Sequence, residues 1–317
     1  MPWHFAAEKY GLKLAQEFSR RGVTLGDGSD PVNLLNPAIP PQTVLAERLK
    51  ALVLDWAGTT VDFGSVAPAR TMQRIFASHH IELTEDEARQ HMGLPKKDHI
   101  RAILGISRIR DVWNKEFSAV PTEKDVETLY AQFIPLQFSC LMDYSAVLDG
   151  VPEAVESFRA RGLKIGSTTG YTREMLDMLL ESSAKEGYAP DCSVTPGEVI
   201  AGRPHPYMIY ECAIRLQVYP TAAIAKIGDT PVDVKEGLNA GAWSIGVAGT
   251  GNKVGLTRDE FFALPVQERE VQLTRARKEL REAGAHYVID NLSELNAVLD
   301  DIDARLEAAG CEAQSHA

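Results

Sequence analysis

Short apolar runs alternate with helical stretches along the second half of the chain. These runs have the length of buried strands and lie at residues 163–169, 192–195, 223–228, 243–247 and 287–289. Such alternation predicts a parallel sheet covered by helices on both faces. A further apolar run, Ala51 to Leu54, ends in Asp55 and belongs to the same sheet.

The stretch between the first two predicted strands has a helical pattern almost throughout. Met72, Ile75 and Phe76 share one face, and Thr84-x-x-Glu87 has the form of a capping box. Because two strands of one sheet flank this stretch, we predict an α/β core interrupted by a helical insertion. The predicted boundaries are 46–66 and 147–300 for the core and 67–146 for the insertion.

Two terminal segments fall outside this division. Residues 1–45 predict an N-terminal extension, with an amphipathic helix over 1–21 and then a proline-rich linker. The extension either buttresses the core or forms a subunit contact, and the pattern does not decide between them. Residues 301–317 are predicted to be a C-terminal tail.

Composition narrows the class of protein. The 317 residues include 33 Lys and Arg against 44 Asp and Glu, a net charge of −11. That balance excludes the broad basic surface of nucleic-acid binding and disfavours docking on anionic membranes. Four cysteines without a CxxC pair fit a reducing cytoplasm. No apolar run approaches the roughly 20 residues of a membrane span, so we expect a cytoplasmic protein.

Polar residues gather at the carboxyl ends of the predicted strands, where open parallel sheets bind ligands. The set comprises Asp55, Thr169, Gly170, Arg203, Asp229 and Asp233. A carboxylate can attack phosphorus, other carboxylates can hold Mg²⁺, and a cation and a hydroxyl can bind phosphoryl oxygens. Each residue alone has an ordinary structural explanation, such as a turn or a helix cap. Together, in this order, they predict phosphoryl transfer.

The set resembles the motifs of the haloacid dehalogenase (HAD) superfamily of phosphohydrolases. The matching motifs are DxxxT at 55–59, the strand-ending Thr169, Arg203, and GDxxxD at 228–233. The resemblance implies a HAD-like Rossmannoid core with an α-helical cap domain that closes over the site. It also implies Mg²⁺ held by Asp55, the Ala57 carbonyl and Asp229, with Asp233 in a supporting position.

Ala57 departs from the general superfamily pattern. Most phosphatases of this class have a second Asp at that position, which protonates the leaving oxygen. A leaving group that needs no acid explains the departure. Cleavage of a C–P bond, with its electrons drawn into a protonated imine, is such a case.

The segment from Met92 to His99 carries two lysines and a histidine. Lys96 and His99 are three residues apart and share a helix face, whereas Lys97 is rotated by about 100° from Lys96. A lysine near a histidine base can form a Schiff base with an aldehyde. Alone, such a lysine is most often a solvated helix residue.

Five segments are similar to the phosphonoacetaldehyde hydrolase (phosphonatase) family of this superfamily: DWAGTTVDFG (55–64), MGLPKKDH (92–99), IGSTTGYTREM (165–175), AGRPHPYM (201–208) and IGDTPVDVKEG (227–237). The likeness, over about 47–300, implies hydrolysis of a small phosphonate at its C–P bond in phosphonate catabolism. It implies Asp55 as nucleophile, Lys96 as imine-forming residue, His99 in proton transfer, and a homodimer. The implied substrate contacts are Met92, Thr169, Gly170, Tyr171 and Arg203.

Two features depart from that family, and two alternatives stay open. Ser65 stands where a cysteine is often found, and residues 1–45 have no counterpart. A conventional HAD phosphomonoesterase or phosphomutase acting on a small phosphorylated metabolite would use the same motifs, although Ala57 argues against it. A non-catalytic phosphate-responsive protein is the second alternative, disfavoured because the set of site residues is intact.

Overall fold

A six-stranded parallel sheet forms the centre of the computed structural model, which describes residues 46–315, with side chains to 309. The strands are β1 (Ala51–Leu54), β2 (Lys164–Thr168), β3 (Cys192–Val194), β4 (Ile224–Gly228), β5 (Trp243–Val247) and β6 (Tyr287–Ile289). Their spatial order is β3-β2-β1-β4-β5-β6, so the strand order reverses at β1. The predicted α/β class is confirmed, and the carboxyl edge beside β1 is where such sheets bind ligands.

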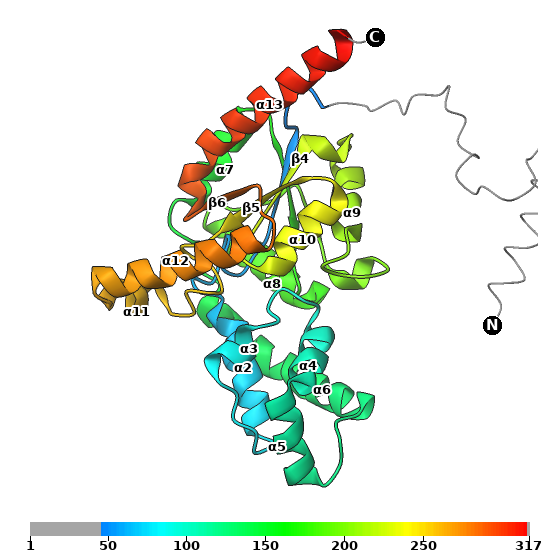
Figure 1. Cartoon of the computed structure of the whole chain (residues 1–317), viewed down its shortest axis with the longest axis vertical. Coiled ribbons are helices and arrows are strands. Elements are labelled where there is room, and N and C mark those ends of the chain that lie inside the picture. Colours follow the sequence, from blue (N-terminus) through cyan, green and yellow to red (C-terminus); the bar gives the residue numbers. More distant parts are fainter. Residues whose placement is uncertain (1–45, 316–317) are drawn as a thin grey trace, which may run out of the picture. The chain divides into compact units, whose positions relative to one another are not determined.

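Helices cover both faces of the sheet (Figure 1). The helices of the core are α7 (Val151–Ala160), α8 (Arg173–Lys185), α9 (Tyr207–Leu216), α10 (Pro231–Ala240), α11 (Arg258–Ala263), α12 (Val266–Glu282) and α13 (Leu295–Ser315). Helices α9 and α10 lie on one side of the central strands, and α7 and α13 lie on the other. Because both faces are covered, β1 and β4 are buried along their whole length.

The segment between β1 and β2 is helical, as predicted, and forms the lower lobe in Figure 1. Its helices, called the cap below, are α2 (Val66–Ala77), α3 (Glu85–Arg89), α4 (Lys96–Gly105), α5 (Ser107–Phe117) and α6 (Glu123–Leu141). Met72, Ile100 and Phe133 from three of these helices are fully buried, so the cap has its own apolar interior. The predicted capping box of Thr84 and Glu87 starts α3.

The predicted C-terminal tail, residues 301–317, begins within a helix. Helix α13 runs without a break across residue 300. Leu299, Ile302 and Leu306 follow each other at helical spacing and are buried against the core, so this segment packs as part of the core. The predicted N-terminal helix and linker, residues 1–45, lie outside the described residues.

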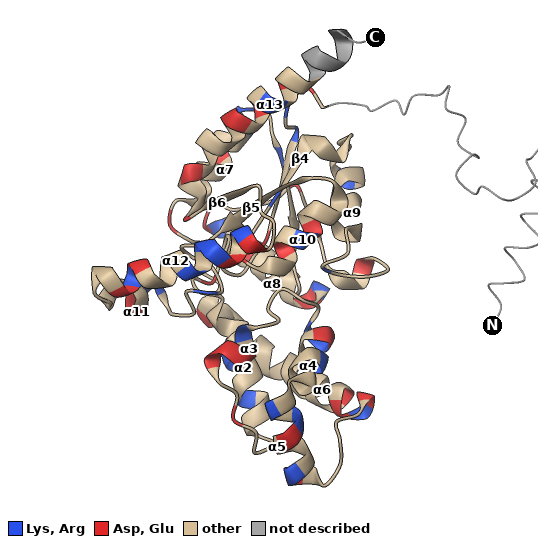
Figure 2. Cartoon of the chain, in the orientation of Figure 1, with Lys and Arg blue, Asp and Glu red and all other residues tan. Residues whose placement is uncertain are grey.

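Charged residues of both signs are interspersed over the helices of the core and the cap (Figure 2). Among the helices of the described part, none is both long and apolar enough to cross a membrane.

Candidate active site

The ends of β1, β2 and β4 bring the predicted site residues together. Leu54 lies in register with Ser167 on one side and Ile227 on the other, so Asp55, Thr169 and Asp229 emerge at one edge. A small cavity of about 20 Å³ lies between this edge and the cap. Nine of the eleven predicted site residues line it: Asp55, Ala57, Met92, Lys96, Thr169, Gly170, Tyr171, Arg203 and Asp229. His99 and Asp233 do not line it.

Arg203 contacts the predicted nucleophile directly. Its Nη2 donates to Asp55 Oδ1 at 2.7 Å, and its Nη1 lies 2.9 Å from Asp233 Oδ1. The guanidinium is almost fully buried, so it is a fixed positive charge beside the carboxylate. Burial raises the pKa of Asp55, and the charge of Arg203 opposes that rise.

Lys226 and Glu236, which the sequence analysis missed, extend the ion-pair network around Arg203. Lys226 Nζ lies 2.9 Å from Asp233 Oδ1, and Glu236 Oε2 accepts from Arg203 Nε at 3.0 Å. Thr168 Oγ1 donates to Glu236 at 3.1 Å. A lysine inside an otherwise apolar strand was the available signal for Lys226, since buried charges need partners.

Asp55, Asp229 and Asp233 approach one another closely enough to share a cation, with one oxygen of each within 4.8 Å of the others. Asp233 is already bound by Arg203, Lys226 and the Thr230 hydroxyl, which fits the predicted supporting position. Asp229 Oδ1 is buried without a hydrogen-bond partner among the described residues. Burial and the nearby Asp55 raise the pKa of Asp229 well above its usual range. A divalent cation would satisfy both features.

The turn after β1 fits closely around Asp229. Gly58 has φ +81°, and a Cβ there would lie 2.2 Å from Asp229 Oδ2, so only glycine is accommodated. Ser65 Oγ donates to the same oxygen at 3.2 Å, and the Asn252 amide donates at 2.6 Å. Ser65 therefore has a defined contact with a predicted metal ligand.

The cap contributes Lys96, the first residue of α4, to the roof of the cavity. Only 6% of this residue is exposed, and its Nζ lies 5.2 Å from the centre of the Tyr171 ring. Burial lowers the pKa of Lys96 to about 8. Lys97 points away, as predicted: it is half-buried and pairs with Glu127 at 2.6 Å.

His99 lies on the same buried face of α4 as Lys96. Both of its ring nitrogens are without hydrogen-bond partners in the part of the chain that the structure describes. Burial, with the nearby charge of Lys96, lowers the pKa of His99 well below its usual range. The imidazole is therefore neutral.

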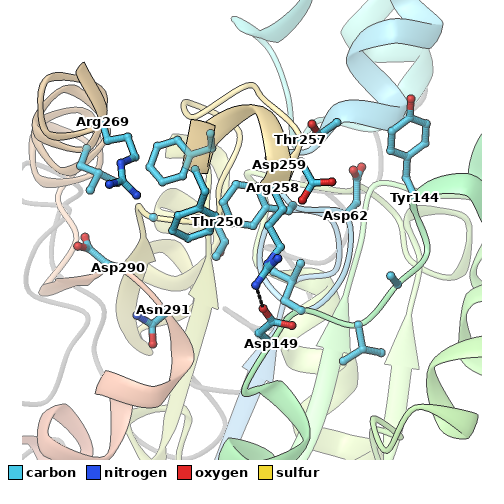
Figure 3. Close-up of a pocket in the computed structure, with 18 of the residues that line it drawn as sticks. Asp62, Tyr144, Asp149, Thr250, Thr257, Arg258, Asp259, Arg269, Asp290 and Asn291 are labelled. Atoms are coloured by element: carbon cyan, nitrogen blue, oxygen red, sulfur yellow. Dashed lines mark ion pairs between the residues drawn. The ribbon is translucent and has the colours of Figure 1, made fainter. Parts of the chain in front are cut away.

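A much larger cavity of about 790 Å³ lies away from these residues, beside α11 and α12 (Figure 3). Phe261 and Phe262 form part of its apolar wall, and Arg258 pairs with Asp149 at its edge at 2.7 Å. It contains none of the eleven predicted site residues. The smaller cavity, where carboxylates, a cation and an amine converge, is therefore the candidate active site.

The parallel sheet, the inserted cap and the acidic strand ends define a HAD-like hydrolase. Residues 49–241 match the family model described as haloacid dehalogenase-like hydrolase. Curated relatives make the assignment narrower. The chain is 43% identical over 256 residues to the phosphonoacetaldehyde hydrolase of Bacillus cereus, covering 81% of this chain and 97% of that protein. The chain belongs to the phosphonoacetaldehyde hydrolase family.

Two further similarities agree with this assignment. The bifunctional phosphonoacetaldehyde hydrolase/aminoethylphosphonate transaminase of Clostridioides difficile is 45% identical over 260 residues. That match covers 82% of this chain but only 41% of the bifunctional protein. The crystal structure of a phosphonoacetaldehyde hydrolase-like protein from Oleispira antarctica superimposes with a TM-score of 0.82 at 38% identity. It covers 85% of this chain and 98% of that one.

Proposed function

We propose that the chain hydrolyses the C–P bond of phosphonoacetaldehyde to give acetaldehyde and phosphate. The observation that carries the proposal is a buried lysine amine in the roof of the same closed cavity that holds a strand-end carboxylate in its floor. The family assignment supports the substrate. The alternative of a conventional phosphomonoesterase or phosphomutase is not favoured, since Ala57 leaves no general acid at the usual position.

Lys96 starts the reaction in this proposal. Its neutral amine attacks the aldehyde carbon, a C–N bond forms, and water leaves to give an iminium. His99, on the same helix face, accepts and returns the protons of this step. Met92 and Tyr171 line the cavity beside the amine and hold the two-carbon chain.

Asp55 then attacks phosphorus. The new O–P bond forms as the C–P bond breaks, and the C–P electron pair moves into the iminium to give an enamine. Arg203, Thr169 and the backbone at Gly170 bind the phosphoryl oxygens. Water hydrolyses the aspartyl-phosphate, and the enamine takes a proton on carbon and is hydrolysed to acetaldehyde and free Lys96.

The carboxylate cluster fits Mg²⁺, a hard cation that prefers oxygen ligands. Asp55, the Ala57 carbonyl and Asp229 would hold it, and Asp233 would orient its surroundings through Arg203 and Lys226. When bound, Mg²⁺ supplies positive charge that offsets the charge on the phosphoryl group. Asp229 Oδ1 has no hydrogen-bond partner in the described part of the chain, and this observation favours a cation here.

Borohydride reduction in the presence of phosphonoacetaldehyde tests the proposal. The reagent should trap a secondary amine on Lys96, identified by peptide mapping. Lys96→Arg keeps the charge but cannot form the imine, so C–P cleavage should be abolished. Lys97→Arg, on the exposed side of α4, is the matched control and should keep full activity. Label on Lys97, or substantial turnover by Lys96→Arg, would exclude the Schiff-base mechanism.

Three broader features complete the proposal. They are a cytoplasmic location, a homodimer, and the division into an N-terminal extension, an α/β core that continues through α13, and a cap, with the other boundaries as predicted above. Light scattering of the purified full-length protein tests the dimer directly. A monomer at assay concentrations would exclude it.

A further inference from the structure

Arg89, the last residue of α3, is a buried cation at the junction of the cap and the core. Its Nη1 donates to the carbonyls of Gly64 at 2.7 Å and Ser65 at 3.1 Å, in the linker that leads into α2. Nη1 also lies 3.2 Å from Asn252 Oδ1, and Nη2 donates to the Gly255 carbonyl at 3.0 Å. Arg89 is only 6% exposed, so water competes little for these bonds.

Two of the residues that Arg89 contacts also hold Asp229. The Asn252 amide and the Ser65 hydroxyl both donate to Asp229 Oδ2, at 2.6 and 3.2 Å. Asn252 Nδ2 lies 3.3 Å from the Arg89 carbonyl, so the asparagine contacts Arg89 in both directions. Arg89 of the cap is therefore linked to the Asp229 carboxylate in two ways, once through Ser65 and once through Asn252.

The small size of the cavity indicates that the cap and the core lie close together here, and we call this arrangement the closed conformation. A cavity of about 20 Å³ has room for about one water molecule, so a phosphonate enters only when the cap moves away. The acceptors at Asn252 and Gly255 lie in the core loop between β5 and α11. Opening therefore separates Arg89 from them, and closure restores the bonds.

We propose that Arg89 is a positioning residue that latches the closed cap and thereby sets the Asp229 carboxylate for its divalent cation. A guanidinium suits this role because its planar fork of five donors serves several carbonyls at once. A lysine ammonium in the same place keeps the charge but loses the fork. The activity assay of this inference rests on the proposed function, whereas the metal-binding assay needs only the folded protein.

The test is Arg89→Lys, examined first without substrate. Mn²⁺ binding to the full-length protein, followed by electron paramagnetic resonance, should weaken about tenfold, as expected for residues that orient metal ligands. The kcat/KM for phosphate release should fall by at least a similar factor. Arg108→Lys is the matched control, because Arg108 is an exposed cap arginine that pairs with Glu87 inside the cap. It should change neither quantity.

Asn252→Ala tests the link from the other side and serves if Arg89→Lys does not fold. It removes both side-chain contacts to Arg89 and keeps the backbone amide that donates to Asp229. Mn²⁺ binding should weaken in this variant as well. The double variant should bind no more weakly than the weaker single variant, because both changes break the same link.

Two results would overturn the proposal. One is unchanged Mn²⁺ affinity in either folded single variant, and the other is a double variant whose loss equals the sum of the two single losses. A wild-type protein that binds Mn²⁺ but releases no phosphate from phosphonoacetaldehyde would instead exclude the proposed function. The metal comparison between wild type and variants would stay informative in that case.

Discussion

Lys96 can act as a nucleophile only while its amine is neutral, and its surroundings favour that form. Burial lowers its pKa to about 8; the charge of Arg203 acts in the same direction, whereas Asp55 opposes it. The neutral fraction increases as pH rises through that value. We therefore expect kcat/KM to rise about tenfold per pH unit below pH 8 and to level off above it.

Phosphate release measured from about pH 6 to about pH 9.5 checks this expectation. Lys97→Arg provides the control, because Lys97 lies outside the site cavity and pairs with Glu127. Its profile should superimpose on that of the wild type. A rate that does not change with pH below 8 would contradict a titrating Lys96 amine.

Ser65 donates a hydrogen bond to the predicted metal ligand Asp229, and the contribution of this bond to metal binding can be measured. Its hydroxyl donates one of the two hydrogen bonds on Asp229 Oδ2. A hydrogen bond of this kind contributes about 1 kcal/mol, so Ser65→Ala should raise the Mg²⁺ concentration for half-maximal activity several-fold. Ser65→Cys has a weaker donor, so its Mg²⁺ requirement should lie between those of the wild type and Ser65→Ala. Ser78→Ala is the control, because that hydroxyl donates to Ile75 inside the cap; equal Mg²⁺ requirements in all four proteins would contradict the role.

At the level of elements, β4 and α10 enclose a buried charge cluster. Lys226 is 0% exposed and lies between Asp233 and Glu236, which are three residues apart on one face of α10. Lys226→Met removes one of the two cations that balance these carboxylates. Because breaking a buried ion pair costs about 3–5 kcal/mol, the free energy of unfolding should fall by that amount.

Urea unfolding followed by circular dichroism measures this loss. Lys185→Met is the control, since Lys185 pairs with Glu181 on the exposed surface of α8. Its free energy of unfolding should change by no more than about 0.5 kcal/mol. A loss below about 1 kcal/mol for Lys226→Met would contradict an ionised, mutually dependent cluster.

The sequence pattern predicted elements better than it predicted contacts between them. Each strand was placed within about one residue, because buried parallel strands are short apolar runs. Asp55, Thr169 and Asp229 were found because strand ends converge by geometry. Arg89 left no signal in the pattern: its partner Asn252 lies 163 residues away, and an arginine on a short helix is ordinarily a surface residue.

At the scale of the whole molecule, an acidic protein is able to bind an anion because positively charged groups are placed at the binding cavity. The net charge is −11, yet the cavity is bounded by Lys96 above and Arg203 below. Asp55 and Asp229 face the same space, and a divalent cation would offset them. The cap supplies one of the cations and the core supplies the other, so the complete site exists only in the closed conformation.

Gly170 provides a test of that closure. A Cβ at Gly170 would lie 2.9 Å from the Leu94 carbonyl oxygen and 3.4 Å from that of Gly93, and its three nearest atoms all belong to the loop before α4. Gly170→Ala therefore obstructs the closed cap while leaving the packing of the core unchanged. We expect kcat/KM to fall about 10- to 100-fold, as for other small misplacements of reacting groups, with the thermal midpoint unchanged.

The position of Lys96 distinguishes obstructed closure from a local loss of phosphate binding. In the closed conformation this lysine is buried, so an amine-acylating reagent should modify it slowly in the wild type and faster in Gly170→Ala. Gly105→Ala is the matched control, because a Cβ at that end of α4 meets nothing within 4 Å. It should leave both activity and labelling unchanged. Slow labelling of Lys96 in a Gly170→Ala protein that has lost activity would show that the cap still closes, and would place the defect in the binding of the phosphoryl group.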